Sequence, residues 1–265
     1  MKSIQSSSKP DVAILLSFLL ILPLGLLADL ITEPVEQMTV EAFSTSAWTD
    51  HTLAFEEVFK VIKVDSMLEF GLGKSTKIFL DNVPSVASLE LASECTLNRS
   101  LSWYQECIKK FMPVYPHWRT SLRMCSADVG VLTANAFQGK PLPGSLSPAY
   151  FKEIADACAQ GLALLNGTCT LAFVDSGEYG RADIVNELFS KKIPIVAAHD
   201  TIATDWERQF YGYERLDPPK GYVAITFPVR KHITFWIRQD LYGDETIGKI
   251  KLAAERMESL ACLAS

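Results

Sequence analysis

Short apolar runs alternate with longer amphipathic segments along most of the chain. Apolar residues recur every three or four positions in the longer segments, which predicts helices at residues 52–63, 97–111, 149–165 and 244–263, with shorter ones at 74–80 and 182–189. The compact runs predict strands at residues 66–70, 86–90, 170–175, 193–198, 222–227 and 233–239. This alternation is typical of an α/β fold with a doubly wound, mostly parallel sheet, and the last two runs suggest an antiparallel strand at one edge. Residues 113–148 contain five prolines and form the least regular stretch.

The longest apolar run lies near the N-terminus, at residues 12–28. Two lysines precede this run and acidic residues follow it, which is the layout of a signal peptide or a single membrane anchor. A buried core helix is the alternative. We therefore predict a signal peptide or anchor at residues 1–28, a polar linker at 29–50 and a globular domain at 51–265. The protein would be exported or membrane-anchored through this segment, although an uncleaved anchor could leave the domain facing the cytosol.

Composition narrows the range of partners. The chain has 265 residues, of which 48% are hydrophobic and 21% charged, and this balance excludes a disordered chain or a collagen. With a net charge of −6, the chain lacks the excess of basic residues that is typical of a general nucleic-acid binder, so we expect no nucleic-acid partner. The six cysteines form no C-x-x-C pair, which argues against a structural zinc site.

A glycine-containing turn follows the first predicted strand, in the sequence Glu-Phe-Gly-Leu-Gly-Lys-Ser-Thr at residues 69–76. Gly71 and Gly73 permit a tight turn and a close approach of a ligand to the backbone. A phosphate-binding P-loop would need glycine where Leu68 stands, and a dinucleotide fingerprint would need a third small residue where Thr76 stands. The remaining interpretation is a nucleoside-binding turn with an acidic residue at the end of the strand.

Two glutamates strengthen this interpretation. Glu90 ends the second predicted strand, where its carboxylate could accept two hydrogen bonds from a ribose diol. Glu69 would face a cationic part of the ligand, such as an ammonium or a sulfonium. Two carboxylates suit a cationic nucleoside better than a pyrophosphate. The alternative is a solvated glutamate after each strand, beside an ordinary glycine turn.

With these residues the chain resembles the class I S-adenosylmethionine-dependent methyltransferases over about residues 50–240. The resemblance rests on the turn at 69–73, on Glu90 and on Asp175, which closes a strand in the sequence Ala-Phe-Val-Asp-Ser-Gly. The chain looks closest to small-molecule O-methyltransferase-like members, which often carry a V-D-G-x-H-x-Y segment and a later strand ending in H-D. Here residues 174–179 and 197–201 match those segments, but Ser-Gly-Glu replaces the usual glycine and histidine.

The resemblance implies a seven-stranded Rossmann-like sheet whose last strand is antiparallel, and S-adenosylmethionine as the cofactor. Methyl transfer to a small-molecule acceptor, with a hydroxyl oxygen as the expected receiving atom, would follow. Glu69, Gly71, Gly73 and Glu90 would bind the cofactor. Asp128, shortly after a third strand, would contact the adenine, although a helix cap or turn aspartate fits it equally well.

Three residues are candidates for the chemistry: Asp175, His199 and Asp200. Because the two aspartates would lie at neighbouring strand ends, they could bind Mg²⁺, which lowers the pKa of an acceptor hydroxyl. Alternatively, His199 could deprotonate the acceptor, or only support its neighbours. We expect Arg181 on the surface, with binding of an anionic substrate group as the alternative.

Two other function classes remain open. A nicotinamide-dependent oxidoreductase is disfavoured by Thr76 and Glu69. A non-catalytic exported or anchored binding protein that keeps the fold is the other, since a leader points outward while S-adenosylmethionine is made in the cytosol. Trp48 and His51, close to the linker, could close over a bound cofactor.

Overall fold

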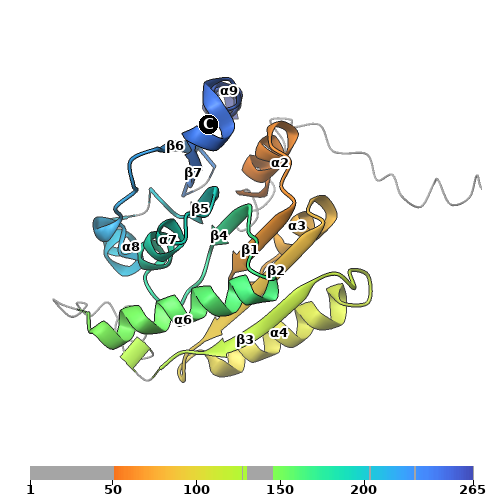
Figure 1. Ribbon diagram of the computed structural model, residues 1–265, viewed down its shortest axis with the longest axis vertical. Helices are drawn as coiled ribbons and strands as arrows, with labels where there is room; N and C mark the ends of the chain where they lie inside the picture. Colours follow the sequence, from red (N-terminus) through yellow and green to blue (C-terminus); the bar gives the residue numbers. More distant parts are fainter. Residues whose placement is uncertain (1–50, 127, 130–145, 203, 230, 265) are drawn as a thin grey trace, which may run out of the picture. The chain divides into compact units, whose positions relative to one another are not determined.

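The computed structural model describes residues 51–126, 128–129, 146–202, 204–229 and 231–264 (Figure 1). The predicted leader at 1–28 and linker at 29–50 lie outside these residues and stay predictions. Within the described ranges, no helix combines the length and the apolar character that crossing a membrane requires.

Seven strands form one mixed sheet in the order β3-β2-β1-β4-β5-β7-β6. The five strands from β3 to β5 are parallel to their neighbours, whereas β7 runs antiparallel to both β5 and β6. The antiparallel strand β7 therefore lies near one edge of the sheet, as predicted, between β5 and the outermost strand β6. The strands are β1 Ser66–Phe70, β2 Ser85–Ala92, β3 Arg119–Met124, β4 Leu171–Val174, β5 Ile195–His199, β6 Tyr222–Phe227 and β7 Ile233–Arg238. The predicted doubly wound, seven-stranded sheet is confirmed.

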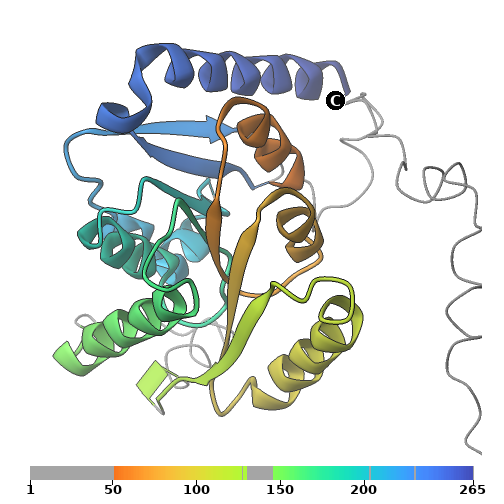
Figure 2. The same ribbon diagram turned by 45° about the vertical axis from the view of Figure 1, so that its right-hand side comes forward.

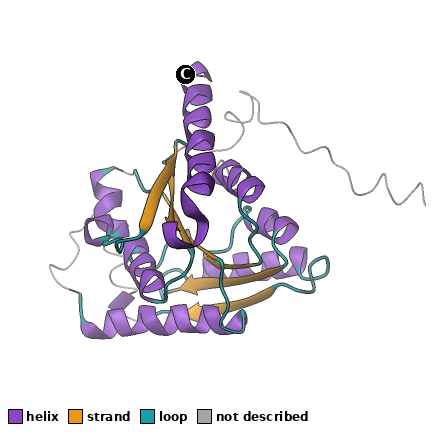
Figure 3. Ribbon diagram, turned by 45° about the horizontal axis from the view of Figure 1, so that its top comes forward, coloured by secondary structure: helices purple, strands orange, loops and turns teal. Residues whose placement is uncertain are grey.

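Helices cover both faces of the sheet (Figures 1 and 2). One face carries α2, α3, α4 and α9, and the other carries α6, α7 and α8, so that the strands lie between two helical layers (Figure 3). The helices are α2 His51–Val61, α3 Thr76–Asn82, α4 Leu97–Phe111, α6 Pro148–Leu164, α7 Arg181–Ser190, α8 Asp205–Tyr211 and α9 Gln239–Ala264, with a 3-10 turn η3 at Tyr213–Arg215. A break at Gly243, whose φ is +69°, interrupts the regular geometry of α9.

Strand β3 is the one strand that the hydrophobic pattern did not predict. It lies at the edge of the sheet, in the stretch expected to be irregular, and its residues are exposed or only half-buried. A strand with one neighbour and a solvated surface does not need an apolar run, so its sequence carries little signal.

A cluster of phenylalanines fixes α2 against the sheet. The ring of Phe55 in α2 packs edge-on against Phe79, Phe173 and Phe235, at centroid distances of 4.7, 4.8 and 5.0 Å. Edge-to-face packing of this kind stabilises a core beyond the area it buries. It also holds the first turn of α2, which carries His51, over the centre of the sheet.

Candidate cofactor cavity and buried charge cluster

A cavity of about 340 Å³ opens where β1, β2 and β4 end. Ligands of open α/β sheets bind at these carboxyl ends, and the volume lies in the range of small-molecule sites, about 300–1,000 Å³. The residues that line the cavity include Gly71, Glu90, Arg99, Asp175, Gly177 and Glu178.

Gly71 makes the turn after β1 possible. Its φ is +89°, and a Cβ atom at this position would lie 2.7 Å from the carbonyl oxygen of Asp175. Residue 71 must therefore be glycine both for its conformation and for its close approach to the segment after β4. Gly73, by contrast, does not line the cavity, and its N–H donates a 3.0 Å hydrogen bond to Oγ1 of Thr76.

Glu90 lies in the cavity two residues before the end of β2, and only 8% of the residue is exposed. Its Oε2 accepts a 2.9 Å hydrogen bond from the backbone N–H of Leu72, and Trp103 holds the same residue by donating to its carbonyl oxygen at 2.7 Å. Burial raises the pKa of Glu90 to about 7, although the hydrogen bond from Leu72 opposes the rise. The binding of a ribose diol by this carboxylate stays a prediction.

Glu69 does not line the cavity, which corrects the prediction that two glutamates share it. The residue is fully buried, and its carboxylate accepts hydrogen bonds from the hydroxyls of Thr76 at 3.0 Å and Ser88 at 2.7 Å. Because Glu69 pairs with Ser88 in the parallel ladder, both side chains point to the same face of the sheet. Burial raises its pKa to about 8. Glu69 thus holds α3 to the sheet, and its contact with a cationic part of a ligand stays a prediction.

The predicted adenine contact, Asp128, is exposed beyond the end of β3 and is not among the described residues that line the cavity. Ala127, the residue before it, lies outside the described residues. Its role stays a prediction.

Glu178 is a cavity residue that the sequence analysis did not single out. It is 3% exposed, and its Oε1 accepts hydrogen bonds from the hydroxyls of Thr96 at 2.6 Å and Ser93 at 3.1 Å. These contacts join the loop after β4 to the loop after β2. The sequence signal that could have identified Glu178 is its carboxylate, which lies three residues beyond Asp175 and so shortly after a buried strand.

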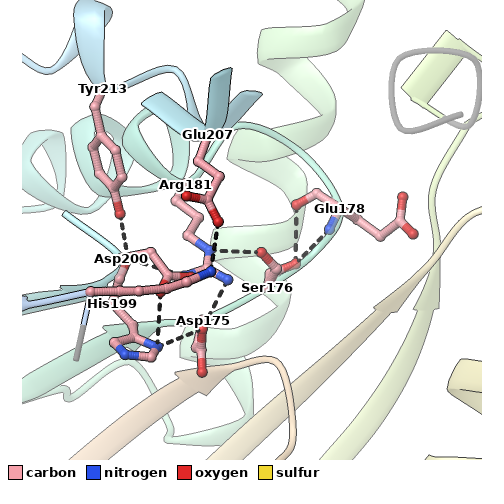
Figure 4. Close-up of polar contacts among 9 residues, drawn as sticks. Asp175, Ser176, Glu178, Arg181, His199, Asp200, Glu207 and Tyr213 are labelled. Carbon is pink, nitrogen blue, oxygen red and sulfur yellow. Dashed lines mark hydrogen bonds and ion pairs between the residues drawn. The ribbon is translucent and has the colours of Figure 1, made fainter. Parts of the chain in front are cut away.

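Beside the cavity, Arg181 bridges the two predicted catalytic aspartates (Figure 4). Its Nη2 lies 2.9 Å from Oδ1 of Asp175, and its Nη1 lies 2.7 Å from Oδ2 of Asp200. The guanidinium also stacks on the ring of Tyr211, 4.0 Å from its centroid. Only 5% of Arg181 is exposed, so the expectation of a surface arginine is wrong. A bidentate cation between two strand ends explains why it is buried.

This ion pairing sets the charge of the cluster. Burial alone would raise the pKa of Asp175, but Arg181 and the nearby imidazole of His199 outweigh it and hold that pKa well below its usual range. Burial likewise disfavours the charged form of Arg181, yet Asp175 and its other neighbours raise the pKa further above its ordinary value. Both groups are charged at neutral pH.

His199 lies directly behind Asp175, as seen from the cavity lining. Its Nδ1 is 3.4 Å from Oδ1 of Asp175 and 3.7 Å from Oδ1 of Asp200. Burial would lower the pKa of His199, but its hydrogen bond to Asp175 and the two carboxylate charges raise it. The structure therefore brings all three predicted catalytic residues together, but Asp175 is the one that reaches the described cavity.

His51, at the start of α2, is the fifth residue of this cluster, which also contains Asp175, Arg181, His199 and Asp200. Its ring lies 4.5 Å from that of His199 and 5.5 Å from that of Phe173, and the residue is 2% exposed. Burial lowers its pKa to about 4, so the imidazole is neutral at neutral pH. His51 is not among the described residues that line the cavity, and its predicted role of closing over a cofactor has no support in this position.

A magnesium ion between Asp175 and Asp200 does not fit this arrangement. The guanidinium of Arg181 occupies the position between the two carboxylates and neutralises one of their two charges. Mg²⁺ would have to displace a buried, doubly paired cation. We therefore derive no chemical step through magnesium at this pair.

Comparisons with known proteins give structural matches only. No protein-family model matches the sequence, and no curated protein matches it. Solved structures that match include the SAH-bound methyltransferase PaMTH1 of Podospora anserina, at 14% identity and a TM-score of 0.41, covering 88% of this chain and 99% of that one. A putative caffeoyl-CoA O-methyltransferase from Staphylococcus aureus matches at 13% identity and a TM-score of 0.42, covering 81% of this chain and 98% of that one. A methyltransferase from Geobacter sulfurreducens matches at 10% identity and a TM-score of 0.40, covering 81% and 94%.

The fold itself is clear from the sheet. Its strand order, with a single antiparallel strand next to the outermost one, is that of the Rossmann-like methyltransferase fold.

Proposed function

We propose that this protein transfers a methyl group from S-adenosylmethionine to a small-molecule acceptor, with a hydroxyl oxygen as the receiving atom. The observation that carries the proposal is the position of Glu90. Its buried carboxylate lies in the cavity, beside a turn that requires glycine at residue 71. A ribose diol placed against this turn would donate both hydroxyls to a charged acceptor, which is the stronger kind of hydrogen bond.

The charge of the cavity favours a cationic nucleoside. Three carboxylates line it, from Glu90, Asp175 and Glu178, and one cationic side chain, Arg99, lies at its wall. A sulfonium is attracted to such a wall, whereas the pyrophosphate of a nicotinamide dinucleotide is repelled. The same charges that favour S-adenosylmethionine therefore disfavour the oxidoreductase alternative.

The chemistry requires few groups. An acceptor oxygen forms its bond to the methyl carbon as the carbon–sulfur bond breaks, and the main contribution of a protein is to align the three atoms. The hydroxyl proton must leave during this step. Asp175 faces the cavity and can accept a hydrogen bond from that hydroxyl, while His199 behind it has the raised pKa of a group that can keep the proton.

Thermal unfolding of the full-length protein tests the proposal. A ligand that binds only the folded state stabilises it by about 2.7 kcal/mol at a hundredfold excess over Kd, so S-adenosylhomocysteine should raise Tm by several degrees and NAD should not. The shift should be smaller in Glu90→Gln and unchanged in Glu245→Gln, whose side chain is 85% exposed in α9. Stabilisation by NAD alone would reject the proposal in favour of the oxidoreductase.

Turnover separates an enzyme from a binding protein that only keeps the fold. We expect transfer of labelled methyl from S-adenosylmethionine to members of a panel of small phenols and catechols. Asp175→Asn should lower the transfer rate by at least tenfold, while S-adenosylhomocysteine still stabilises the variant. Cofactor binding without transfer to any hydroxyl acceptor would favour the non-catalytic alternative.

A further inference from the structure

We propose that His51, Asp175 and His199 form a binding site for a divalent transition-metal ion. One ligand atom from each of these residues, a ring nitrogen of each histidine and a carboxylate oxygen of the aspartate, lies within 4.8 Å of the other two. The site differs from the magnesium pair considered above, because it takes two nitrogen ligands in place of Asp200. Asp175 is shared with Arg181, whose Nη2 lies 2.9 Å from its Oδ1.

The hydrogen bonding of the two histidines supports the site. Neither ring nitrogen of His51 has a hydrogen-bond partner among the described residues, and Nε2 of His199 has none either. His51 is 2% exposed and His199 is 6% exposed. Buried polar atoms are nearly always paired, so three unpartnered imidazole nitrogens on two adjacent rings need an explanation. A shared metal ion satisfies one nitrogen of each ring, and while the ion is bound His199 is a ligand and not the acceptor of the hydroxyl proton.

The fold delivers these ligands from three separate elements. His51 begins α2, Asp175 follows β4 and His199 ends β5. The rings of His51 and His199 lie 4.5 Å apart, and the phenylalanine cluster under α2 keeps His51 over the sheet. Zinc–nitrogen bonds of about 2.0–2.1 Å require ligand atoms roughly 3–3.5 Å apart. Small rotations of the two rings toward each other would bring them to that spacing.

The local charge also suits a cation. Asp175 and Asp200 contribute two negative charges at the cluster, and Arg181 contributes one positive charge. Two imidazoles and one carboxylate are the ligands of Zn²⁺, Fe²⁺ and related ions, whereas Mg²⁺ prefers oxygen ligands. Because Asp175 also lines the cavity, the ion would lie at its inner wall.

Titration of the full-length protein with Co²⁺ tests the site, because Co²⁺ held by nitrogen and oxygen ligands absorbs visible light, so its binding can be followed by spectroscopy. After removal of metal with a chelator, we expect one equivalent of Co²⁺ to bind and Zn²⁺ to displace it. His51→Ala and His199→Ala should each weaken binding by at least tenfold. His117→Ala, which removes an imidazole outside the cluster, should leave binding unchanged.

Two outcomes would overturn the proposal: no saturable binding of Co²⁺ or Zn²⁺, or binding that persists unchanged in His51→Ala. If either alanine variant fails to fold by circular dichroism, His51→Gln and His199→Gln keep the size of the side chain and serve in its place. The S-adenosylhomocysteine shift is measured with EDTA present, so loss of the metal site and loss of the cofactor site give separate results.

Discussion

The Glu90 carboxylate accepts a 2.9 Å hydrogen bond from the backbone N–H of Leu72. One side chain thereby joins the end of β2 to the turn that follows β1, and it does so inside the cavity. The conformation of the turn after β1 therefore depends on whether the carboxyl group of Glu90 is ionised.

Cofactor affinity should rise with pH. Because burial raises the pKa of Glu90 to about 7, the carboxyl group is mostly protonated at pH 6 and mostly ionised at pH 8. A ribose diol donates to the ionised form, so S-adenosylhomocysteine should bind up to about tenfold more tightly at pH 8 than at pH 6. Calorimetric titration measures this change. Glu90→Gln should bind more weakly and with a flatter pH dependence, and an equal slope in both proteins would contradict the assignment.

Substitution of Gly71 should damage both fold and binding. A side chain at φ +89° is strained, and its Cβ would lie 2.7 Å from a backbone oxygen. Gly71→Ala should therefore lose at least about 1–2 kcal/mol of unfolding free energy, together with the cofactor-induced rise in Tm. Gly248→Ala is the matched control, because a Cβ there meets nothing within 4 Å on α9 and should stabilise the helix by up to about 1 kcal/mol. Equal effects of the two substitutions in urea unfolding would argue against a constrained turn.

Removal of Arg181 should destabilise the protein strongly. Arg181→Met removes the cationic partner of the buried carboxylate of Asp200 and of the half-buried carboxylate of Asp175, and breaking a buried ion pair in this way costs about 3–5 kcal/mol. Arg238→Met, which removes an ion pair with the exposed Asp240, should cost less than about 1 kcal/mol in the same urea experiment.

The pH dependence of the Arg181 effect has a definite sign. The pKa of Asp175 is depressed in the folded state, so its contribution to stability is present above its ordinary pKa of 3.8 and is lost as pH falls through the folded value. Without Arg181 the carboxyl group of Asp175 can protonate at higher pH. The difference in unfolding free energy between wild type and Arg181→Met should therefore become smaller from pH 7 to pH 4. A difference that does not change with pH would show that the lost ion pairs do not cause the destabilisation.

Glu69 should make the protein less stable as the solution becomes more basic. Its pKa rises from 4.5 to about 8 on folding, so its favourable contribution is complete below pH 4.5 and is lost as pH increases through about 8. In Glu69→Gln, the amide can still accept from Ser88 and donate to Thr76, but it does not titrate. Tm measured from pH 5 to pH 9 should fall less steeply in this variant. Glu245→Gln should keep the wild-type slope.

Much of the fold could be predicted from local pattern. The bounds predicted for β1, β6 and α4, at 66–70, 222–227 and 97–111, agree with the structure. These elements bury a continuous run or a regular stripe of apolar residues, and that periodicity is a property of the sequence itself. The half-exposed edge strand β3 has no such stripe and was missed.

The site depended on contacts between distant segments. The sequence placed Glu90 and Asp175 at strand ends, because the end of an apolar run is visible locally. Whether Glu69 faced the cavity or the sheet was decided by its register with Ser88 on the neighbouring strand. Arg181 is buried because β4 and β5 place one carboxylate on each side of it. A charged side chain is stable in a core only where groups of opposite charge pair with it. Local sequence therefore determined which residues reach the rim of the sheet, and only tertiary packing decided which charges meet there.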